Sequence, residues 1–496
     1  MSQKTIAVVG AGIAGLAASI RLSRAGYKVT LFEKNAYTGG KMTVYEQDGY
    51  RFDAGPSLFT LPHLVDDLFE LCGKNPRDHF NYIQHATACK YWWQNGKKLV
   101  LTAQEEENLV AIAEEFGEEA AESSRKYFED AKEKYELTEP YFLQQSLHRA
   151  KTFLDRRVLK VIGAIPRLGL FSTLNEENEK YFNQQELIQL FNRYATYNGS
   201  SPYQTPGIMQ MINHLEHGLG TYLPKGGMHE IAASLTRLAE ELGVDIQLNS
   251  PVEKVHVHGK KCQGIQVQGK ALNFDAVVLN ADVHHAYKHL IDSGVKRPKK
   301  TLAQEPSTSA LIFYWGIDRS FEQLDLHNIF FSKDYRKEFD QIRNSEGFWL
   351  DPTIYINISS KVEHGDAPDG CENWFVMINV PPNSSQDWET IKLKTRATII
   401  ARMSQELGVD IEAHIATERV LDPVMIESYT SSAGGALYGT SSNDRMAAFL
   451  RHPNKKLGGY KGLYFCGGSA HPGGGVPLCL LSGKLAANWC IEDLNG

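Results

Sequence analysis

Short apolar runs alternate with amphipathic segments at the start of the chain. Residues Thr5–Val9 form an apolar, β-branched run, which predicts a buried parallel strand. The pattern then predicts a helix over 16–22 that ends near Gly26, a second strand over Lys28–Phe32, and a further helix over 61–72. The order of strand, helix and strand predicts a βαβ unit, and therefore an α/β domain.

The same alternation returns later in the chain. A helix is predicted over His229–Leu242, followed by strands over Val244–Leu248 and Ala276–Leu279. Near the end of the chain, a predicted strand, Gly462–Cys466, precedes a helix over Leu478–Ala487. These segments indicate that the first α/β unit resumes after an insertion.

The intervening segments have other patterns. Ala88–Leu101 predicts a β-hairpin around Asn95 and Gly96. Residues 104–136 are rich in Glu, Ala and Lys, which predicts a solvated helix with many i,i+4 pairs. Residues 180–220 predict further helix in which polar and aromatic positions are mixed.

Between about residues 305 and 385 the predicted strands become long and aromatic. Ser309–Trp315, Thr353–Asn357 and Asn373–Val380 are bounded by turn residues, and a helix over 386–407 follows. This pattern predicts a separate sheet with one wide apolar face. Such a face belongs more often to a core than to a binding site, and both interpretations stay open at this point.

The loop after the first strand carries Gly-x-Gly-x-x-Gly at Gly10, Gly12 and Gly15. The first glycine permits a tight turn, the second lets the backbone approach a pyrophosphate, and the third lets the helix pack closely on the strand. Glu33 ends the second strand about 20 residues after the loop, where an acid accepts hydrogen bonds from a ribose. An acid there argues against a 2′-phosphate. The motif therefore predicts a dinucleotide other than NADP, with its phosphates at the helix N-terminus.

A second glycine-rich loop, residues 467–477, lies near the other end of the chain. It follows the last predicted strand and opens a helix at Val476. A dinucleotide held from both ends of one chain is typical of flavin oxidoreductases. Free N–H groups at such a helix start can stabilise the negative charge that develops on a reduced flavin.

Composition narrows the class of protein. A chain of 496 residues with 42% hydrophobic residues predicts two or three globular domains. The net charge of −7 gives no reason to expect a nucleic-acid partner. Seven cysteines are scattered without Cys-x-x-Cys spacing, which predicts reduced thiols, a cytoplasmic protein and no metal site.

Membrane contact is predicted only at the surface. The first apolar stretch is the nucleotide-binding strand itself and not a signal peptide, and no apolar run reaches the roughly 18 residues of a membrane span. Residues 156–174 mix Arg and Lys with Val, Ile, Leu and Phe. Such a segment suits a membrane surface, although an ordinary helix packed on the protein explains the same composition.

Taken together, these motifs resemble the bacterial carotenoid desaturase family (phytoene desaturase type), a branch of the flavin amine oxidase superfamily. The resemblance covers nearly the whole chain. Amine oxidases usually carry Gly-Glu at the loop that matches the last motif, and this chain does not. The motifs that carry the resemblance are Val9–Leu16, Glu33, Gly39–Lys41, Phe52–Pro56, Leu223–Met228, Asn280–Asp282 and, above all, Gly468–Pro477.

In that family the cofactor is FAD. The resemblance implies an α/β fold in which a Rossmann-like FAD-binding domain of the amine-oxidase type carries an inserted mixed-sheet substrate domain and a helical region. It places the adenine ribose on Glu33, the pyrophosphate near Lys41, and the flavin against residues 55–58 and the last loop. The residues expected to bind FAD are Gly10, Gly12, Ile13, Ala14, Gly15, Glu33, Lys34, Gly40, Lys41, Gly55, Pro56, Ser57, Leu58, Val252, Asn280, Ala281, Asp282, Gly468, Gly474, Gly475, Val476 and Pro477.

Three structural regions follow from the patterns and the resemblance. The FAD-binding domain is expected to be discontinuous, because the substrate domain and a helical lid interrupt it. The predicted boundaries are 1–75, 222–300 and 420–496 for the FAD-binding domain, 76–103 and 301–419 for the substrate-binding domain, and 104–221 for the helical, membrane-contacting lid.

The resemblance implies desaturation of a carotenoid, and general similarity, particularly around Ala88–Gly96, favours 3,4-desaturation of a 1-hydroxycarotenoid. A hydride would pass to flavin N5 and a proton would leave the neighbouring carbon, because the charge left behind spreads along the polyene. This chemistry needs a long dry slot and no strong acid or base, so no catalytic residue is predicted. Asp53, Glu216 and His471 are candidate bases, but a turn former, a solvated helix acid and a loop residue next to the flavin are the favoured explanations of these three residues.

No second nucleotide-binding pattern is visible, so a quinone or oxygen is the expected electron acceptor. An apolar substrate favours peripheral membrane association of this cytoplasmic protein near 156–174. Several alternatives remain at this point: a phytoene- or lycopene-type desaturase, a carotene isomerase, a non-catalytic carotenoid carrier, and an amine or porphyrinogen oxidase with Cys466 as a candidate for covalent flavin attachment.

Overall fold

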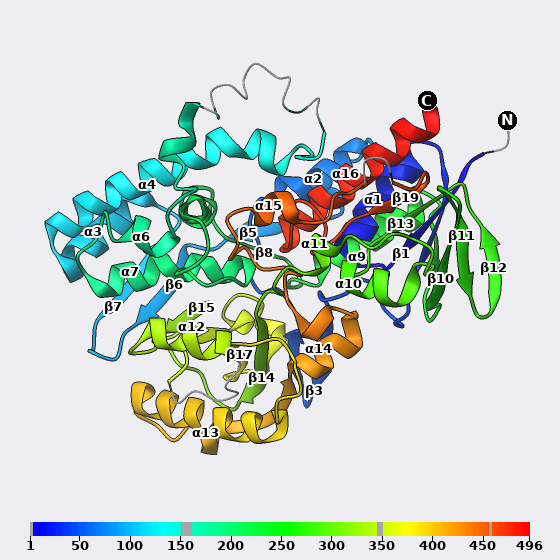
Figure 1. The fold of residues 1–496 in the computed structure, drawn as a ribbon. Coiled ribbons are helices and arrows are strands. Elements are labelled where there is room, and N and C mark those ends of the chain that lie inside the picture. The colour runs from blue at the N-terminus through cyan, green and yellow to red at the C-terminus, as the bar shows by residue number, and fades with distance from the viewer. Residues whose placement is uncertain (1–2, 150–151, 153–160, 162, 345–350, 456–458) are drawn as a thin grey trace.

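The computed structural model describes residues 3–149, 152, 161, 163–344, 351–455 and 459–496. Figure 1 shows a parallel sheet at one side of the molecule, long helices at the opposite side, and a larger sheet below them. Residues 156–160 and 162 of the candidate membrane contact, 156–174, lie outside the described residues. Among the described helices, none is both long enough and apolar enough to cross a bilayer.

The parallel sheet confirms the predicted α/β unit. Its order is β19-β13-β1-β2-β9, and every neighbouring pair is parallel. The central strand, β1, therefore comes from the start of the chain and the edge strand β19 from its end. The inserted segments lie between these two strands in sequence. The strands are β1 (Thr5–Val9), β2 (Lys28–Phe32), β9 (Asp245–Gln247), β13 (Ala276–Leu279) and β19 (Leu463–Phe465).

The two faces of this sheet are covered differently. Ile6 and Val8 pack in one apolar cluster with helices α1 (Ile13–Arg24), α9 (Glu230–Glu241) and α16 (Val476–Asn495). Ala7 and Val9 alternate with them and face an antiparallel sheet of β10, β11 and β12. Because side chains alternate along a strand, both faces of β1 are buried and the run is continuously apolar. The antiparallel strands are β10 (Val252–His258), β11 (Lys261–Val267) and β12 (Lys270–Asn273).

The predicted aromatic strands form a seven-stranded mixed sheet in the order β18-β14-β17-β16-β15-β6-β7. The hairpin predicted around Asn95 and Gly96 is confirmed and forms one edge of it, where β6 pairs in parallel with β15. Two of its strands, β15 and β18, were not predicted. The bounds are β6 (Thr87–Trp92), β7 (Lys98–Thr102), β14 (Ser309–Ile317), β15 (His327–Phe330), β16 (Ile354–Asn357), β17 (Glu372–Val380) and β18 (Ile415–Leu421).

Two helix predictions need correction. The solvated helix over 104–136 is two helices, α3 (Glu105–Phe116) and α4 (Glu118–Thr138), because Gly117 has φ 94° and interrupts the helix. Continuous helix over 180–220 is wrong: after α7 (Gln185–Asn192) the chain has short helical turns and a loop with two prolines. The remaining elements include β3 (Val44–Gln47), β4 (Tyr50–Asp53), α2 (His63–Leu71), β5 (Tyr82–Gln84), α6 (Leu174–Asn178), α8 (Met211–Asn213), β8 (Tyr222–Pro224), α10 (Val283–His285), α11 (Lys299–Leu302), α12 (Tyr335–Asn344), α13 (Trp388–Leu407), α14 (Pro423–Thr430) and α15 (Ala447–Leu450).

The first and last helices pack against each other through a glycine. An ideal Cβ on Gly483 of α16 would lie 2.5 Å from the carbonyl oxygen of Ala14 and 3.0 Å from Cβ of Ala17, both on α1. Gly483 is buried in the middle of its helix. The two helices therefore approach each other at a distance that no other residue type permits.

We expect Gly483→Ala to lower the thermal midpoint of unfolding. In an ordinary helix interior this substitution stabilises by about 1 kcal/mol, so its sign is reversed here. The added methyl group must push α16 away from α1, which typically costs about 1–3 kcal/mol. The matched control is Gly294→Ala, because an ideal Cβ there meets no atom within 4 Å. A Gly483→Ala protein at least as stable as the wild type would contradict the close packing.

Candidate active site

One large cavity of about 1140 Å³ lies between the two sheets. The carboxyl ends of β1, β13 and β19 open into it, and one face of the seven-stranded sheet forms its opposite wall. Ligand cavities in proteins usually measure roughly 300–1,000 Å³, so this one has room for a large ligand or for two. Of the residues expected to bind a dinucleotide, all except Gly15 line it.

Glycines form the tightest part of the cavity wall. An ideal Cβ on Gly10 would lie 2.6 Å from the carbonyl oxygen of Asn280, and one on Gly40 would lie 3.2 Å from Cα of Gly12. Gly15 does not line the cavity, and its ideal Cβ would lie 2.1 Å from the carbonyl oxygen of Gly10. The prediction that Gly15 permits close packing of the helix on the strand is therefore confirmed.

Two helix N-termini open into this same cavity. Gly12, Ile13 and the start of α1 line one part, and Gly475 with Val476 at the start of α16 line another. Neither start has a side-chain cap or an acidic residue in its first turn. Uncapped N–H groups carry partial positive charge, so both ends fit an anionic group of a ligand.

Glu33 lies beside the first of these helix starts. Its side chain is buried and lines the cavity, and its two carboxylate oxygens accept hydrogen bonds from the backbone N–H groups of Ala11 (2.8 Å) and Asn35 (2.9 Å). Each carboxylate oxygen has a further lone pair, so these bonds leave acceptors for ribose hydroxyls. The donor set at this end, with uncapped amides for phosphate and a fixed carboxylate for ribose, fits a dinucleotide.

Lys41 is the buried cation of the cavity wall. Its Nζ donates hydrogen bonds to the carbonyl oxygens of Ala436 (2.7 Å) and Leu437 (2.8 Å). Burial lowers the pKa of Lys41 to about 8, and the nearby carboxylate of Asp282 opposes that effect in part. An ammonium group has three hydrogens, so a third one remains for an anionic ligand.

The middle of the cavity is apolar. Ile312 on β14, together with Phe375 and Met377 on β17, lines it, whereas Leu311 and Phe313 on the opposite face of β14 pack in the large core. The two interpretations of the aromatic sheet are therefore both correct, one for each face. A long apolar wall excludes water and offers no group for acid–base chemistry.

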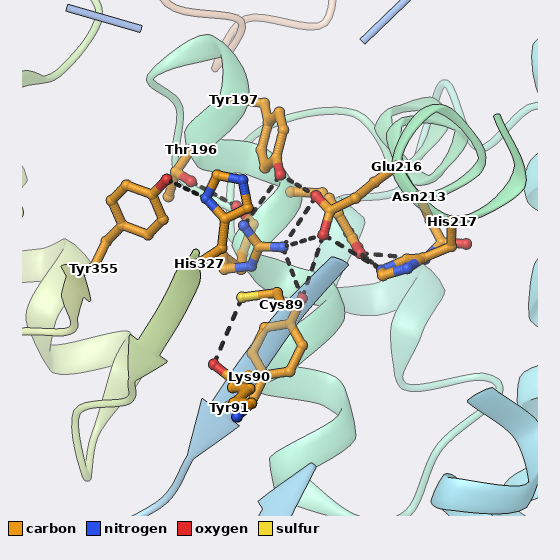
Figure 2. Close-up of polar contacts among 12 residues, drawn as sticks. Cys89, Lys90, Tyr91, Thr196, Tyr197, Asn213, Glu216, His217, His327 and Tyr355 are labelled. Atoms are coloured by element: carbon orange, nitrogen blue, oxygen red, sulfur yellow. Dashed lines mark hydrogen bonds and ion pairs between the residues drawn. The ribbon is translucent and has the colours of Figure 1, made fainter. Parts of the chain in front are cut away.

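The cavity wall also includes a group of polar side chains that we name the polar end: Arg193, Tyr197, Glu216, His327 and Tyr355. Figure 2 shows the last four of them as sticks. Nη2 of Arg193 donates to both carboxylate oxygens of Glu216, at 3.0 and 3.2 Å. The hydroxyl of Tyr197 donates to the same carboxylate. The prediction of a solvated helix acid at Glu216 is therefore wrong, because this side chain is only 1% exposed and ion-paired.

The charge state of Glu216 follows from its partners. Burial alone would raise the pKa of Glu216, but the Arg193 guanidinium and the Tyr197 hydroxyl outweigh it and hold that pKa below its ordinary value. The carboxylate is therefore ionised at neutral pH and fully engaged in hydrogen bonds. Such a group is poorly suited to accept a proton from a substrate.

His327 and Tyr355 form a second chain at the polar end. The Tyr355 hydroxyl lies 2.8 Å from Nδ1 of His327 and 2.8 Å from the hydroxyl of Ser57. The amide of Asn357 donates to the same Nδ1 at 3.2 Å, so Nδ1 is an acceptor and Nε2 bears the hydrogen. Burial lowers the pKa of His327 to about 4, so the ring is neutral at neutral pH.

The other candidate bases do not reach the cavity. Asp53 accepts hydrogen bonds from the N–H groups of Met228 (2.8 Å) and His229 (3.0 Å), which places it at the start of α9 in a structural role. Nε2 of His471 lies 3.0 Å from the carbonyl oxygen of Gln145, and the side chain does not line the cavity. Cys466 is fully buried away from the cavity wall, and burial raises its pKa.

Sequence reasoning missed most of the polar end. Arg193 and Tyr197 share one short 3-10 helix, whereas His327 and Tyr355 lie on strands β15 and β16, and no motif joins the four residues. The available signal was a cationic residue among aromatic ones at 193–197, a composition that also fits an ordinary helix surface. The cavity also includes Cys479, in the first turn of α16, rather than Cys466.

Known proteins share these features. The chain matches the family model described as flavin containing amine oxidoreductase over residues 13–491. It is 51% identical over 487 residues to the 1-hydroxycarotenoid 3,4-desaturase of a Flavobacterium species, with 98% of each chain covered. It is 32% identical over 502 residues to the carotenoid 3,4-desaturase of Haloarcula japonica, with 100% of this chain and 99% of that one covered.

Among solved structures, cyclohexylamine oxidase from Brevibacterium oxydans superimposes with a TM-score of 0.64 over 100% of both chains. At 13% identity, that likeness shows a shared fold alone. The family match begins within the first glycine loop and includes the second, and the two desaturases align along nearly the full chain. The chain therefore belongs to the flavin-containing amine oxidoreductase family, with carotenoid desaturases among its relatives.

Proposed function

We propose that this protein is an FAD-dependent carotenoid desaturase that introduces the 3,4 double bond into a 1-hydroxycarotenoid. One observation carries the proposal: a single cavity has a dinucleotide-type end, an apolar wall and a group of buried polar side chains. The identity of 51% to a 1-hydroxycarotenoid 3,4-desaturase along nearly the full length supports the same substrate class.

FAD fits the first end of the cavity. The start of α1 would hold the pyrophosphate, Glu33 the adenine ribose, and Val252 the adenine, while residues 55–58 and the start of α16 would lie against the flavin. A bound flavin supplies an acceptor for two electrons and a hydrogen taken from adjacent CH2 groups. The N–H groups of Val476 and Leu478 would stabilise negative charge at their end of the cavity, and Pro477 between them has none to offer.

The side chains of the cavity wall would align the substrate and exclude water. The apolar wall at Ile312, Phe375 and Met377 excludes water and aligns a polyene along the sheet. The carboxylate of Glu216 is occupied by Arg193 and Tyr197, and His327 is neutral, so neither group is poised as a strong base. We therefore assign no catalytic residue, and water is the final acceptor of the proton.

Three further points belong to the proposal. The electron acceptor is a quinone or oxygen. A nicotinamide acceptor would need a second dinucleotide site, and the described cavity has one dinucleotide-type end. The protein is cytoplasmic and peripherally bound to a membrane, where its apolar substrate dissolves. The FAD-binding domain comprises 1–75, 222–300 and 420–496, the substrate domain 76–103 and 301–419, and the lid 104–221.

The first test mixes FAD-loaded protein, without oxygen, with liposomes that contain a 1-hydroxycarotenoid. We expect the flavin absorption band to bleach while the carotenoid spectrum shifts to the red, because desaturation lengthens the polyene and reduces the flavin. The two spectra are followed together in one cuvette.

Other outcomes of this test favour other functions. A carotenoid that changes only after the flavin has been reduced beforehand indicates an isomerase. Desaturation of phytoene or lycopene with no action on hydroxylated carotenoids indicates a different step on the same substrate class. An unchanged spectrum with every carotenoid refutes the proposal and points to amines or porphyrinogens.

Lys41 makes FAD affinity depend on pH. Only the charged lysine attracts a pyrophosphate, and its pKa of about 8 means that the charge is present at pH 7 and lost by pH 9. We expect the dissociation constant of FAD, measured by flavin fluorescence quenching, to rise about tenfold between these pH values. Lys41→Met should bind more weakly at pH 7 and lose the pH dependence.

The control for this titration is Lys254→Met, because that side chain is exposed on β10 and does not line the cavity. It should bind FAD as the wild type does at both pH values. A Lys41→Met protein whose FAD affinity still falls between pH 7 and pH 9 would exclude Lys41 as the group that titrates.

Membrane binding is tested at the segment 156–174. Phe171 is 69% exposed, and Met446 and Phe449 are further exposed apolar side chains. We expect Phe171→Asp, and charge reversal of Arg156 and Arg157, each to lower sedimentation with anionic liposomes severalfold. Charge reversal of Lys299 and Lys300, at the start of α11, is the control. Unchanged sedimentation of both test variants would remove this segment from the membrane contact.

A further inference from the structure

The polar end stands in contrast to the ligand proposed for the cavity. An apolar polyene gains nothing from a buried cation, an ionised carboxylate and a neutral imidazole along its path. Figure 2 shows Tyr197, Glu216, His327 and Tyr355 directed toward one another from helical turns and strands. The polar end therefore calls for an explanation beyond the shape of the slot.

Two N–H donors of the polar end have no hydrogen-bond partner among the described residues. The first is Nε of Arg193, which is buried and unpaired although both of its terminal nitrogens are engaged. The second is Nε2 of His327, since both contacts of this ring go to Nδ1. A buried donor without a partner, such as Nε of Arg193, is rare in proteins and calls for an explanation.

We propose that the polar end is the binding site for the terminal hydroxyl of the substrate, with Arg193 and His327 as its donors. A hydroxyl oxygen has two lone pairs and can accept a hydrogen bond from each of these two N–H groups. This inference rests on the proposed function, and it names the part of the cavity that selects a hydroxylated carotenoid over a plain one.

The position of the polar end agrees with the bond that reacts. The chain of hydroxyls runs from His327 through Tyr355 to Ser57, which lies in the turn proposed to contact the flavin. A 1-hydroxyl is separated from C3 by only two carbon atoms, so a group that binds it must lie near the reacting CH2 groups. A hydroxyl site at the remote end of the slot would not meet this requirement.

The fixed geometry of the site favours selectivity. Arg193 is held by Glu216 and by the hydroxyls of Tyr91 (3.0 Å) and Tyr197 (3.3 Å), so its guanidinium cannot turn away from an apolar ligand. A carotenoid with hydrogen in place of the hydroxyl would leave the N–H groups unpaired in a dry cavity. Sites built around a substrate hydroxyl discriminate strongly against the analogue that lacks it for this reason.

The test compares a 1-hydroxycarotenoid with the matched carotenoid that has hydrogen at the same carbon. Dissociation constants are measured on the FAD-loaded protein with its flavin reduced beforehand, so that no desaturation occurs. We expect the wild type to bind the hydroxylated ligand at least about tenfold more tightly. His327→Phe should bring this ratio close to one by weakening only the hydroxylated ligand.

Further variants separate recognition from structural damage. His327→Gln should keep part of the preference, because its amide can still donate. Arg193→Met with Glu216→Leu tests the second donor without leaving an unpaired buried charge. The matched control is Tyr287→Phe, which removes a buried hydroxyl 3.1 Å from a histidine ring outside the cavity and should leave the ratio unchanged.

The outcomes distinguish this inference from the proposed function. Equal wild-type affinities for the two ligands, or a His327→Phe protein that weakens both alike, would overturn the hydroxyl site even if desaturation occurs. A clear preference that His327→Phe abolishes would support the site even if the oxidised enzyme turned over neither carotenoid, and that lack of turnover would refute the desaturase proposal alone.

Discussion

The contact between α1 and α16 determines where the cavity lies. These helices come from opposite ends of the chain, and Gly483 lets them approach until a side chain at that position would meet the backbone of Ala14. Their N-termini are thereby directed into one cavity, where both are left without caps. All strands of the seven-stranded sheet come from the chain between these two helices, and this sheet lies opposite the uncapped helix ends.

The cavity places charged groups next to an apolar wall, where charges are poorly solvated. Uncapped amides, Glu33 and Lys41 make the dinucleotide-type end suitable for an anionic ligand, whereas Ile312 and Phe375 form an apolar wall. Low polarity strengthens every electrostatic interaction at its border, so the charges must be fixed by partners. Glu33 is held by two backbone amides and Lys41 by two carbonyl oxygens, and neither depends on water.

The sequence predicts the parts of this structure that depend on neighbours along the chain. Gly10, Gly12 and Gly15 give a local pattern, and so does the loop before Val476, because each turn is encoded within a few residues. The break at Gly117 was also local, but a helix tolerates an isolated glycine, so composition alone favoured one long helix. Strand β18 was missed because its alternating burial is weak at a sheet edge.

The polar end could not be predicted, because its residues meet only through tertiary packing. Glu216 lies 23 residues from Arg193 in sequence, and His327 comes from β15 of the seven-stranded sheet. An acid among polar helix residues normally faces water, and Glu216 can be buried because it forms an ion pair with Arg193. Removing either partner would leave an uncompensated buried charge, so neither can be lost without the other. Burying the pair beside an apolar cavity wall costs desolvation free energy. A polar ligand atom that forms hydrogen bonds at this site would offset part of that cost.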